Sequence, residues 1–114
     1  MSQTQTVVET TAKLLGDKIR SRTARVGIIG LGYVGLPLAV EFAKAGYSVT
    51  GIDVSDEKTR SVNAGESYIG DIQSTTLAGL VNSGRLRATT DFSAVLELDT
   101  INICVPTPLR KTKD

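Results

Sequence analysis

Three glycines and one aspartate have the spacing of a site that binds a phosphate-containing ligand. Gly30, Gly32 and Gly35 form a Gly-x-Gly-x-x-Gly motif between an apolar run at residues 25–30 and a segment of helical periodicity. Asp53 ends the next apolar run, at about the 20-residue distance typical of dinucleotide-binding βαβ units. The glycine motif alone is a weak signal, because glycines cluster in many turns. Its place between a strand and a helix makes it much stronger.

Each glycine has a separate physical role in such a motif. Gly30 allows the tight turn out of the strand, Gly32 leaves room for a pyrophosphate at the backbone, and Gly35 allows helix and strand to pack closely. The N–H groups of Tyr33 and Val34, at the positive end of the helix dipole, are then expected to face the phosphates. Anion binding at this site therefore needs no lysine.

The aspartate predicts which dinucleotide binds. Asp53 is expected to accept hydrogen bonds from the hydroxyls of the adenosine ribose. Its charge would repel the additional phosphate of NADP, so NAD is the predicted cofactor. Lys58 and Arg60 follow closely and would offset part of that repulsion. The alternative interpretation is that the glycines only shape a turn and that Asp53 caps the following helix.

Hydrophobic periodicity predicts alternating strands and helices around these residues. Short apolar or β-branched runs predict strands, and amphipathic runs ended by glycine predict helices. Ser55 and Asp91 are placed to cap two of the helices. We expect strands at residues 25–30, 48–53, 86–89 and 100–105. We expect helices at about residues 5–20, at 55–64 and at 91–96, one that runs from Tyr33 or Val34 to Gly46, and one around Leu77 that ends at Gly84.

The alternation of strands and helices indicates a parallel sheet with right-handed crossovers. The predicted fold is α/β: a Rossmann-type sheet with strand order 3-2-1-4 and flanking helices, a truncated half of a doubly wound fold. Residues 1–24 would form an amphipathic helix and linker that packs on the domain or on a partner chain. Residues 25–114 would form the NAD-binding domain. Because the chain stops just after a strand, we interpret it as the N-terminal fragment of a longer enzyme.

Composition excludes several other classes of function. The 114 residues carry a formal net charge of +1, which gives no global field that would attract nucleic acid or lipid headgroups. There is no histidine and only one cysteine, so neither a metal site nor a disulfide is expected. No apolar run is long enough to span a bilayer and no secretory signal is evident, which makes a cytoplasmic location the default.

Longer motifs give the sequence a specific family resemblance. The segment Val26-Gly-Ile-Ile-Gly-Leu-Gly-Tyr-Val-Gly-Leu-Pro-Leu-Ala39, followed by Gly51-Ile-Asp53, Lys58 and Cys104-Val-Pro-Thr-Pro108, resembles the start of the UDP-glucose/GDP-mannose dehydrogenase family. Within that family, Val-Pro-Thr-Pro-Leu followed by Lys-Thr-Lys-Asp is most similar to the UDP-N-acetylglucosamine and UDP-N-acetylmannosamine 6-dehydrogenases.

The resemblance implies an NAD-dependent oxidoreductase that converts the C6 alcohol of a UDP-sugar to a carboxylate with two NAD. It implies that the pyrophosphate is held by Gly30, Gly32, Tyr33, Val34 and Gly35, the adenosine ribose by Asp53 and Lys58, and the nicotinamide side by Thr107. Thr107 also follows the fourth strand at the carboxyl edge of the sheet, and the alternative there is a turn residue that ends the strand.

The resemblance also implies that the reacting groups lie elsewhere. The nucleophilic cysteine and the sugar-binding residues of the family are downstream of this chain, so no catalytic residue is expected within it. Cys104 lies in an apolar strand, where a free cysteine behaves as a small hydrophobe. Tyr68, with Glu66 and Asp71, is predicted to lie in a surface loop, with closure over substrate as the alternative.

Two other functions remain open from the residues alone. One is a stand-alone NAD-binding regulatory module, and the other is an interaction domain with a vestigial site that pairs through its N-terminal helix. An independent module would be expected to finish with a docked strand or helix, which favours the fragment. Such a fragment would bind NAD weakly and without turnover, and it would self-associate through its uncovered edge and helix faces.

Overall fold

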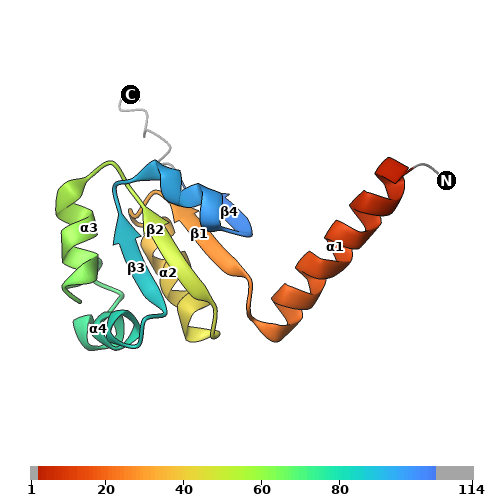
Figure 1. Cartoon of the computed structure of the whole chain (residues 1–114). Coiled ribbons are helices and arrows are strands. Elements are labelled where there is room, and N and C mark those ends of the chain that lie inside the picture. Colours follow the sequence, from red (N-terminus) through yellow and green to blue (C-terminus); the bar gives the residue numbers. More distant parts are fainter. Residues whose placement is uncertain (1–2, 105–114) are drawn as a thin grey trace, which may run out of the picture.

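A four-stranded parallel sheet forms the centre of the molecule. The computed structural model describes residues 3–104, with side chains from residue 10 onward. The strands are β1 (Arg25–Ile29), β2 (Ser48–Ile52), β3 (Leu86–Thr89) and β4 (Thr100–Ile103), and they lie in the order β3-β2-β1-β4 (Figure 1). All neighbouring strands are parallel. The predicted strand order and direction are therefore confirmed.

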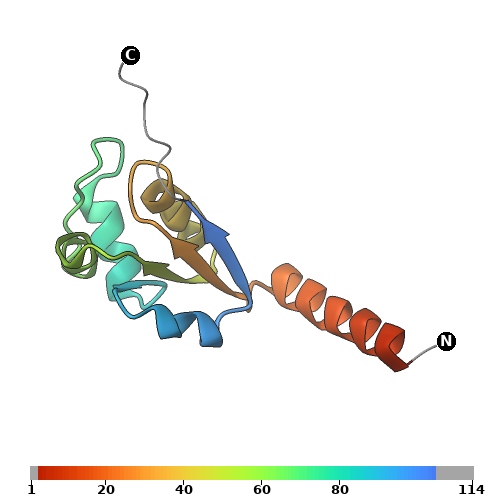
Figure 2. The same ribbon diagram turned by 90° about the horizontal axis from the view of Figure 1, so that it is seen from above.

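Helices lie on both faces of the sheet. α2 (Gly35–Lys44) packs on β1 and β2, α3 (Asp56–Asn63) packs on β3, and α4 (Ser74–Asn82) packs against α2 and α3. The 3₁₀ helix η1 (Phe92–Glu97) leads the chain from β3 back across to β4, so a right-handed connection places it on the opposite face (Figure 2). A Cβ atom at Gly27 of β1 would lie only 2.4 Å from Leu98 Cδ1, so the segment after η1 packs directly on the strand.

An apolar core lies between the sheet and α2, α3 and α4. Ser55 Oγ accepts a hydrogen bond from Lys58 N at 3.2 Å, and Asp91 Oδ1 accepts one from Ser93 N at 2.9 Å, so both predicted helix caps are confirmed. The glycines predicted to end helices, Gly46, Gly65 and Gly84, all have positive φ angles. The largest fully buried side chains of this core are Ile28, Leu31, Leu36, Val62, Leu77 and Leu86.

The two edges of the sheet differ. At the β3 edge, Asn63 Nδ2 donates to Ala88 O at 2.8 Å and Ala88 N donates to Asn63 Oδ1 at 2.9 Å, so one amide side chain satisfies the outward backbone groups of that residue. At the other edge, no strand pairs beyond β4 in the described part of the chain. Ile101 and Ile103 of β4 are 44% and 69% exposed. This edge is therefore both apolar and open.

α1 (Gln3–Ser21) projects away from the sheet as a separate arm (Figures 1 and 2). Its last turn contacts the domain, where Tyr47 Oη donates to Ile19 O at 2.9 Å and Lys18 Nζ forms an ion pair with Asp99 Oδ1 at 3.0 Å. Further along the arm, Leu14 is 58% exposed. The predicted helix is confirmed. Packing on the domain, the first of the two alternatives that we expected for it, is limited among the described side chains to this last turn, and packing on a partner chain stays a prediction.

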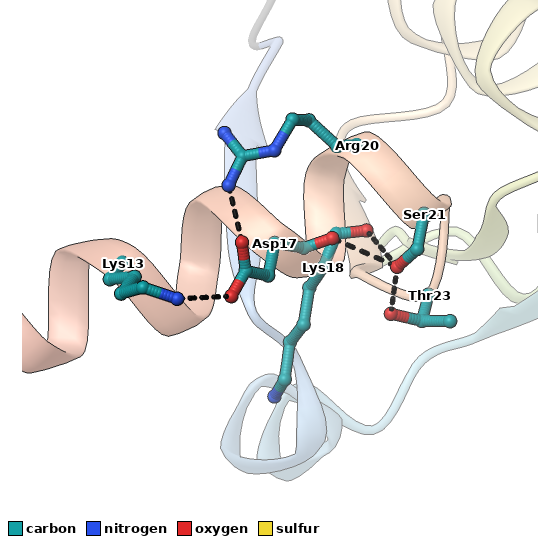
Figure 3. A network of polar contacts seen from close by, with 6 residues as sticks. All are labelled: Lys13, Asp17, Lys18, Arg20, Ser21 and Thr23. Carbon is teal, nitrogen blue, oxygen red and sulfur yellow. Dashed lines mark hydrogen bonds and ion pairs between the residues drawn. The ribbon is translucent and has the colours of Figure 1, made fainter.

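Local contacts stabilise the second half of α1. Lys13 Nζ forms an ion pair with Asp17 at 3.3 Å, and Arg20 pairs with the same carboxylate (Figure 3). Ser21 Oγ donates to Asp17 O at 2.9 Å and lies 2.9 Å from Thr23 Oγ1. The two ion pairs join residues four and three positions apart, which are neighbours on one face of the helix. No helix in residues 3–104 is long and apolar enough to cross a membrane.

Candidate dinucleotide-binding site

The glycine-rich loop connects β1 to α2 at the carboxyl edge of the sheet. Gly30 has a φ angle of +98°, a conformation that L side chains rarely adopt, and its N–H donates to Ile52 O at 2.8 Å. The turn out of β1 therefore requires glycine at this position and is attached to the end of β2. This is the role predicted for Gly30.

The other two glycines of the motif have opposite surroundings. A Cβ atom at Gly35 would lie 1.6 Å from Gly30 O, so the first turn of α2 packs against the loop more closely than any side chain allows. A Cβ atom at Gly32 would have no atom within 4 Å outside its immediate chain neighbours. The fold therefore explains the glycine at position 35, and it leaves open space at position 32.

Backbone donors surround that open space. Within the described chain, the N–H groups of Gly32, Tyr33 and Val34 donate to no protein acceptor. Val34 is the N-cap of α2, so these donors lie at the positive end of the helix dipole. Pro37 is the third residue of α2, and its missing N–H leaves a gap between the hydrogen bonds from Leu36 N to Gly32 O and from Leu38 N to Val34 O. The loop can therefore accept an anion with backbone groups alone.

Asp53 lies directly after β2 and faces the glycine loop. Its Oδ2 accepts a hydrogen bond from Leu31 N at 2.7 Å, and its Oδ1 accepts one from Ser55 N at 2.8 Å. The residue is only 9% exposed. Ser55, not Asp53, supplies the side-chain cap of α3. The alternative role of Asp53 as the cap of that helix is therefore wrong.

Lys58 lies beside this group without contacting the carboxylate of Asp53. It is the third residue of α3 and is half-buried, and it lines a pocket of about 220 Å³ together with Glu57, Ser61 and Tyr68. Arg60, two residues further along α3, forms an ion pair with Asp56 at 3.0 Å on the exposed side of the helix. The structure therefore places Lys58 at a pocket that Tyr68 also lines, and it pairs Arg60 with Asp56.

The remaining predicted residues, Cys104 and Thr107, follow β4 in the sequence. Cys104 N donates to Ile29 O at 2.7 Å, and its half-buried side chain packs against the core. A Cβ atom at Gly35 would lie 3.3 Å from Cys104 Cβ, so this cysteine packs against the start of α2 as a small hydrophobe, but it lies just after β4 and not within the strand as predicted. Thr107, predicted for the nicotinamide side, lies outside the described residues.

Two residues of the site are not evident from the motif. Leu31 joins the glycine loop to Asp53 through its N–H, and its side chain is fully buried. Tyr68 Oη donates to Leu31 O at 2.6 Å from the connection between α3 and α4. Burial, followed by the nearby charge of Asp53, raises the pKa of Tyr68 to about 12. In the sequence, the only sign of the contact between Leu31 and Asp53 is that an apolar residue occupies the position between the first two glycines of the motif.

The site fits a dinucleotide in three respects. The space at Gly32 is open, the adjoining N–H groups donate to no acceptor in the part of the chain that the structure describes, and Asp53 presents an acceptor at the end of the second strand. In a doubly wound sheet this position, outside the carboxyl ends of the strands, is where such ligands bind.

Comparison with known proteins agrees with this geometry. Residues 24–114 match the model of the NAD binding domain of the UDP-glucose/GDP-mannose dehydrogenase family. UDP-N-acetyl-D-mannosamine dehydrogenase of Methanococcus maripaludis is 38% identical over 91 residues, and GDP-mannose 6-dehydrogenase of Pseudomonas putida is 42% identical over 93 residues. Each alignment covers 79% of this chain and 21% of the relative.

A solved structure gives the same result. The fold is similar to that of GDP-mannose dehydrogenase from Pseudomonas aeruginosa in a ternary complex, with a TM-score of 0.70 and 41% identity over 79% of this chain and 21% of that one. The chain thus spans about a fifth of the length of the relatives that it matches. It belongs to the UDP-glucose/GDP-mannose dehydrogenase family and forms the NAD binding domain of that family.

Proposed function

We propose that this chain binds NAD through Gly30, Gly32, Tyr33, Val34, Gly35, Asp53 and Lys58, with Thr107 on the nicotinamide side, as part of a UDP-sugar 6-dehydrogenase. The bound NAD would supply the hydride acceptor for oxidation of the C6 alcohol to a carboxylate, with two NAD used per substrate. The residues of this chain hold and orient the cofactor, and the reacting groups are proposed to lie outside it.

The space at Gly32 is the observation that carries the proposal. Gly30 is required by its positive φ angle and Gly35 by a close approach to backbone, so the fold itself accounts for both. Gly32 has neither constraint, because its φ lies outside the positive range and nothing lies within 4 Å of a Cβ built there. A ligand that approaches the backbone, bound by the adjoining N–H groups, accounts for a glycine at this position.

The charges around Asp53 support NAD over NADP. The carboxylate is held in place by two backbone N–H donors and therefore cannot easily turn away from an added phosphate. Arg60, which could have neutralised that phosphate, is paired with Asp56. Lys58 lines the nearby pocket together with Glu57, so the two side chains bring opposite charges. We therefore expect a clear but incomplete preference for NAD.

The sugar is proposed on separate grounds, because the relatives named above include both UDP-sugar and GDP-mannose enzymes. A UDP-sugar is proposed because the segment Cys104-Val-Pro-Thr-Pro108 and the residues that follow it resemble the UDP-N-acetylhexosamine enzymes. The same relatives give no support to a stand-alone regulatory module. The cytoplasmic location stays a prediction from the sequence.

Calorimetric titration with NAD and NADP tests the cofactor half of the proposal. The chain is expected to bind NAD more tightly than NADP, and Asp53→Asn is expected to lose most of this discrimination because the repelling charge is gone. Asp71→Asn, which removes an exposed carboxylate outside the site, should keep the discrimination. Equal affinity of the unaltered chain for the two nucleotides, or no binding of either, would contradict the proposal.

We also propose that the isolated chain self-associates through β4. The edge carries unpaired backbone groups in the described chain, and its isoleucines Ile101 and Ile103 are exposed beside it. A second copy can satisfy both features by adding its own β4 to the sheet. The net charge of +1 offers little electrostatic repulsion against such pairing.

A further inference from the structure

We infer that Tyr68 is a positioning residue for the cofactor site, which orients the Gly32 N–H group by holding the Leu31 carbonyl. This inference rests on the proposed function of the glycine loop. Tyr68 lies between α3 and α4, and it lies 37 residues away from Leu31 along the chain. Its hydroxyl nevertheless donates to Leu31 O at 2.6 Å, a short and direct hydrogen bond.

The held carbonyl belongs to the same peptide unit as the Gly32 N–H. No cis peptide occurs among residues 3–104, so this unit is trans and planar, and its C=O and N–H point in opposite directions. With the oxygen directed toward Tyr68, the Gly32 N–H must point away from Tyr68. Among residues 3–104 the Gly32 N–H donates to no acceptor, and the space around Gly32 is open.

Leu31 is fixed by two further contacts that make this arrangement rigid. Its own N–H donates to Asp53 Oδ2 at 2.7 Å. Its side chain is 0% exposed and packs over Gly51 of β2, where an added Cβ would lie 2.6 Å from Leu31 Cδ2. The carbonyl is the remaining polar group of Leu31, and Tyr68 binds it. One residue therefore links the loop, the carboxylate of Asp53 and the connection that follows α3.

The environment of Tyr68 keeps its hydroxyl in the donating form. Burial, and next the charge of Asp53, raise the pKa of the phenol to about 12. The hydroxyl is therefore protonated at neutral pH and can donate. The ring is half-buried against the core, so the side chain has little freedom to leave the carbonyl.

The test compares Tyr68→Phe with Tyr47→Phe. Tyr47 is a matched control, because its hydroxyl also donates to a main-chain carbonyl, that of Ile19, at 2.9 Å, but at the base of α1 away from the loop. Both variants keep the ring and lose one hydrogen bond, so we expect similar small decreases in melting temperature. Tyr68→Phe alone should weaken NAD binding, about three- to tenfold by calorimetry, and speed hydrogen exchange of the Leu31 amide in the nucleotide-free chain.

The two readouts separate this inference from the proposed function. If the unaltered chain binds NAD and Tyr68→Phe matches Tyr47→Phe in both affinity and exchange of the Leu31 amide, Tyr68 only packs the core and the inference is wrong. If the unaltered chain does not bind NAD, the proposed cofactor site fails, while faster Leu31 exchange in Tyr68→Phe alone still supports the positioning role. If the chain does not bind NAD and exchange of the Leu31 amide in Tyr68→Phe is also unchanged, the positioning role of Tyr68 is wrong as well.

Discussion

Gly35 and Gly79 are both helical glycines, but only one of them is needed for packing. A Cβ at Gly35 would lie 1.6 Å from Gly30 O and 2.8 Å from Gly30 C, and because these are backbone atoms the helix itself would have to move. We expect Gly35→Ala to lower the free energy of unfolding by about 3 kcal/mol or more. Gly79 is exposed in α4 with nothing within 4 Å, so Gly79→Ala should raise it by about 0.5–1 kcal/mol.

Urea denaturation of the two variants beside the unaltered chain measures this difference directly. An unfolding free energy of Gly35→Ala equal to that of the unaltered chain would show that α2 can move away from the loop. The close approach of helix and strand would then not be the reason for glycine at this position.

At the residue scale, the sequence predicts what depends on local geometry. The turn at Gly30 and the approach at Gly35 follow from a motif whose spacing fixes both. The role of Leu31 and Tyr68 could not be predicted, because their hydrogen bond joins residues 37 positions apart and depends on how the connection after α3 folds back. Asp53 lies at the end of the second strand, as predicted. That its carboxylate accepts hydrogen bonds from Leu31 N and Ser55 N could be learned only from the structure.

Among the secondary-structure elements, the junction of α1, β1 and β4 depends on one carboxylate. Asp99 accepts hydrogen bonds from Arg25 N at 2.8 Å and Lys18 Nζ at 3.0 Å. The hydrogen bond from the Arg25 N–H has the largest effect and the one from Lys18 the next largest, and both hold the pKa of Asp99 below its ordinary value of 3.8. The folded state therefore favours the charged form, and this stabilisation is present above pH 3.8 and is lost as the pH falls through the lowered pKa of the folded state.

We expect Asp99→Asn to lower the melting temperature near pH 7 by about 4 °C, which corresponds to about 1 kcal/mol in a domain of this size. The difference from the unaltered chain should shrink as the pH falls below about 4 and nearly disappear by about pH 2. Thermal melts across this range measure it, with Asp71→Asn as the control that should follow the unaltered chain. A difference that stays constant down to pH 2 would exclude the carboxylate as its source.

The existence and order of the elements were predictable, but their partners were not. Periodicity identified each strand and helix because it reports which face is apolar. It does not report what covers that face. α1 has the amphipathic pattern of a packed helix but contacts the domain at its last turn, and β4 has the isoleucines of a buried strand but lies at an open edge.

For the whole molecule, the open β4 edge leads to a prediction about its assembly state. The chain is expected to self-associate with rising concentration in sedimentation velocity, and Ile103→Lys should reduce this because a charge at the edge opposes strand pairing. Val54→Lys, at a side chain that is 82% exposed after β2, should leave the association unchanged. A chain that remains monomeric at every concentration would contradict self-association through β4.

The central claim is that position 32 is glycine because a side chain there would block the approach of NAD to the backbone. Calorimetric titration of Gly32→Ala with NAD tests this claim most directly. Gly79→Ala is the matched control, since a Cβ at either position has open space around it. We predict that Gly32→Ala keeps the unfolding free energy within about 0.5 kcal/mol of the unaltered chain and binds NAD at least about tenfold more weakly, while Gly79→Ala binds NAD normally. Unweakened NAD binding by Gly32→Ala would contradict the proposed site.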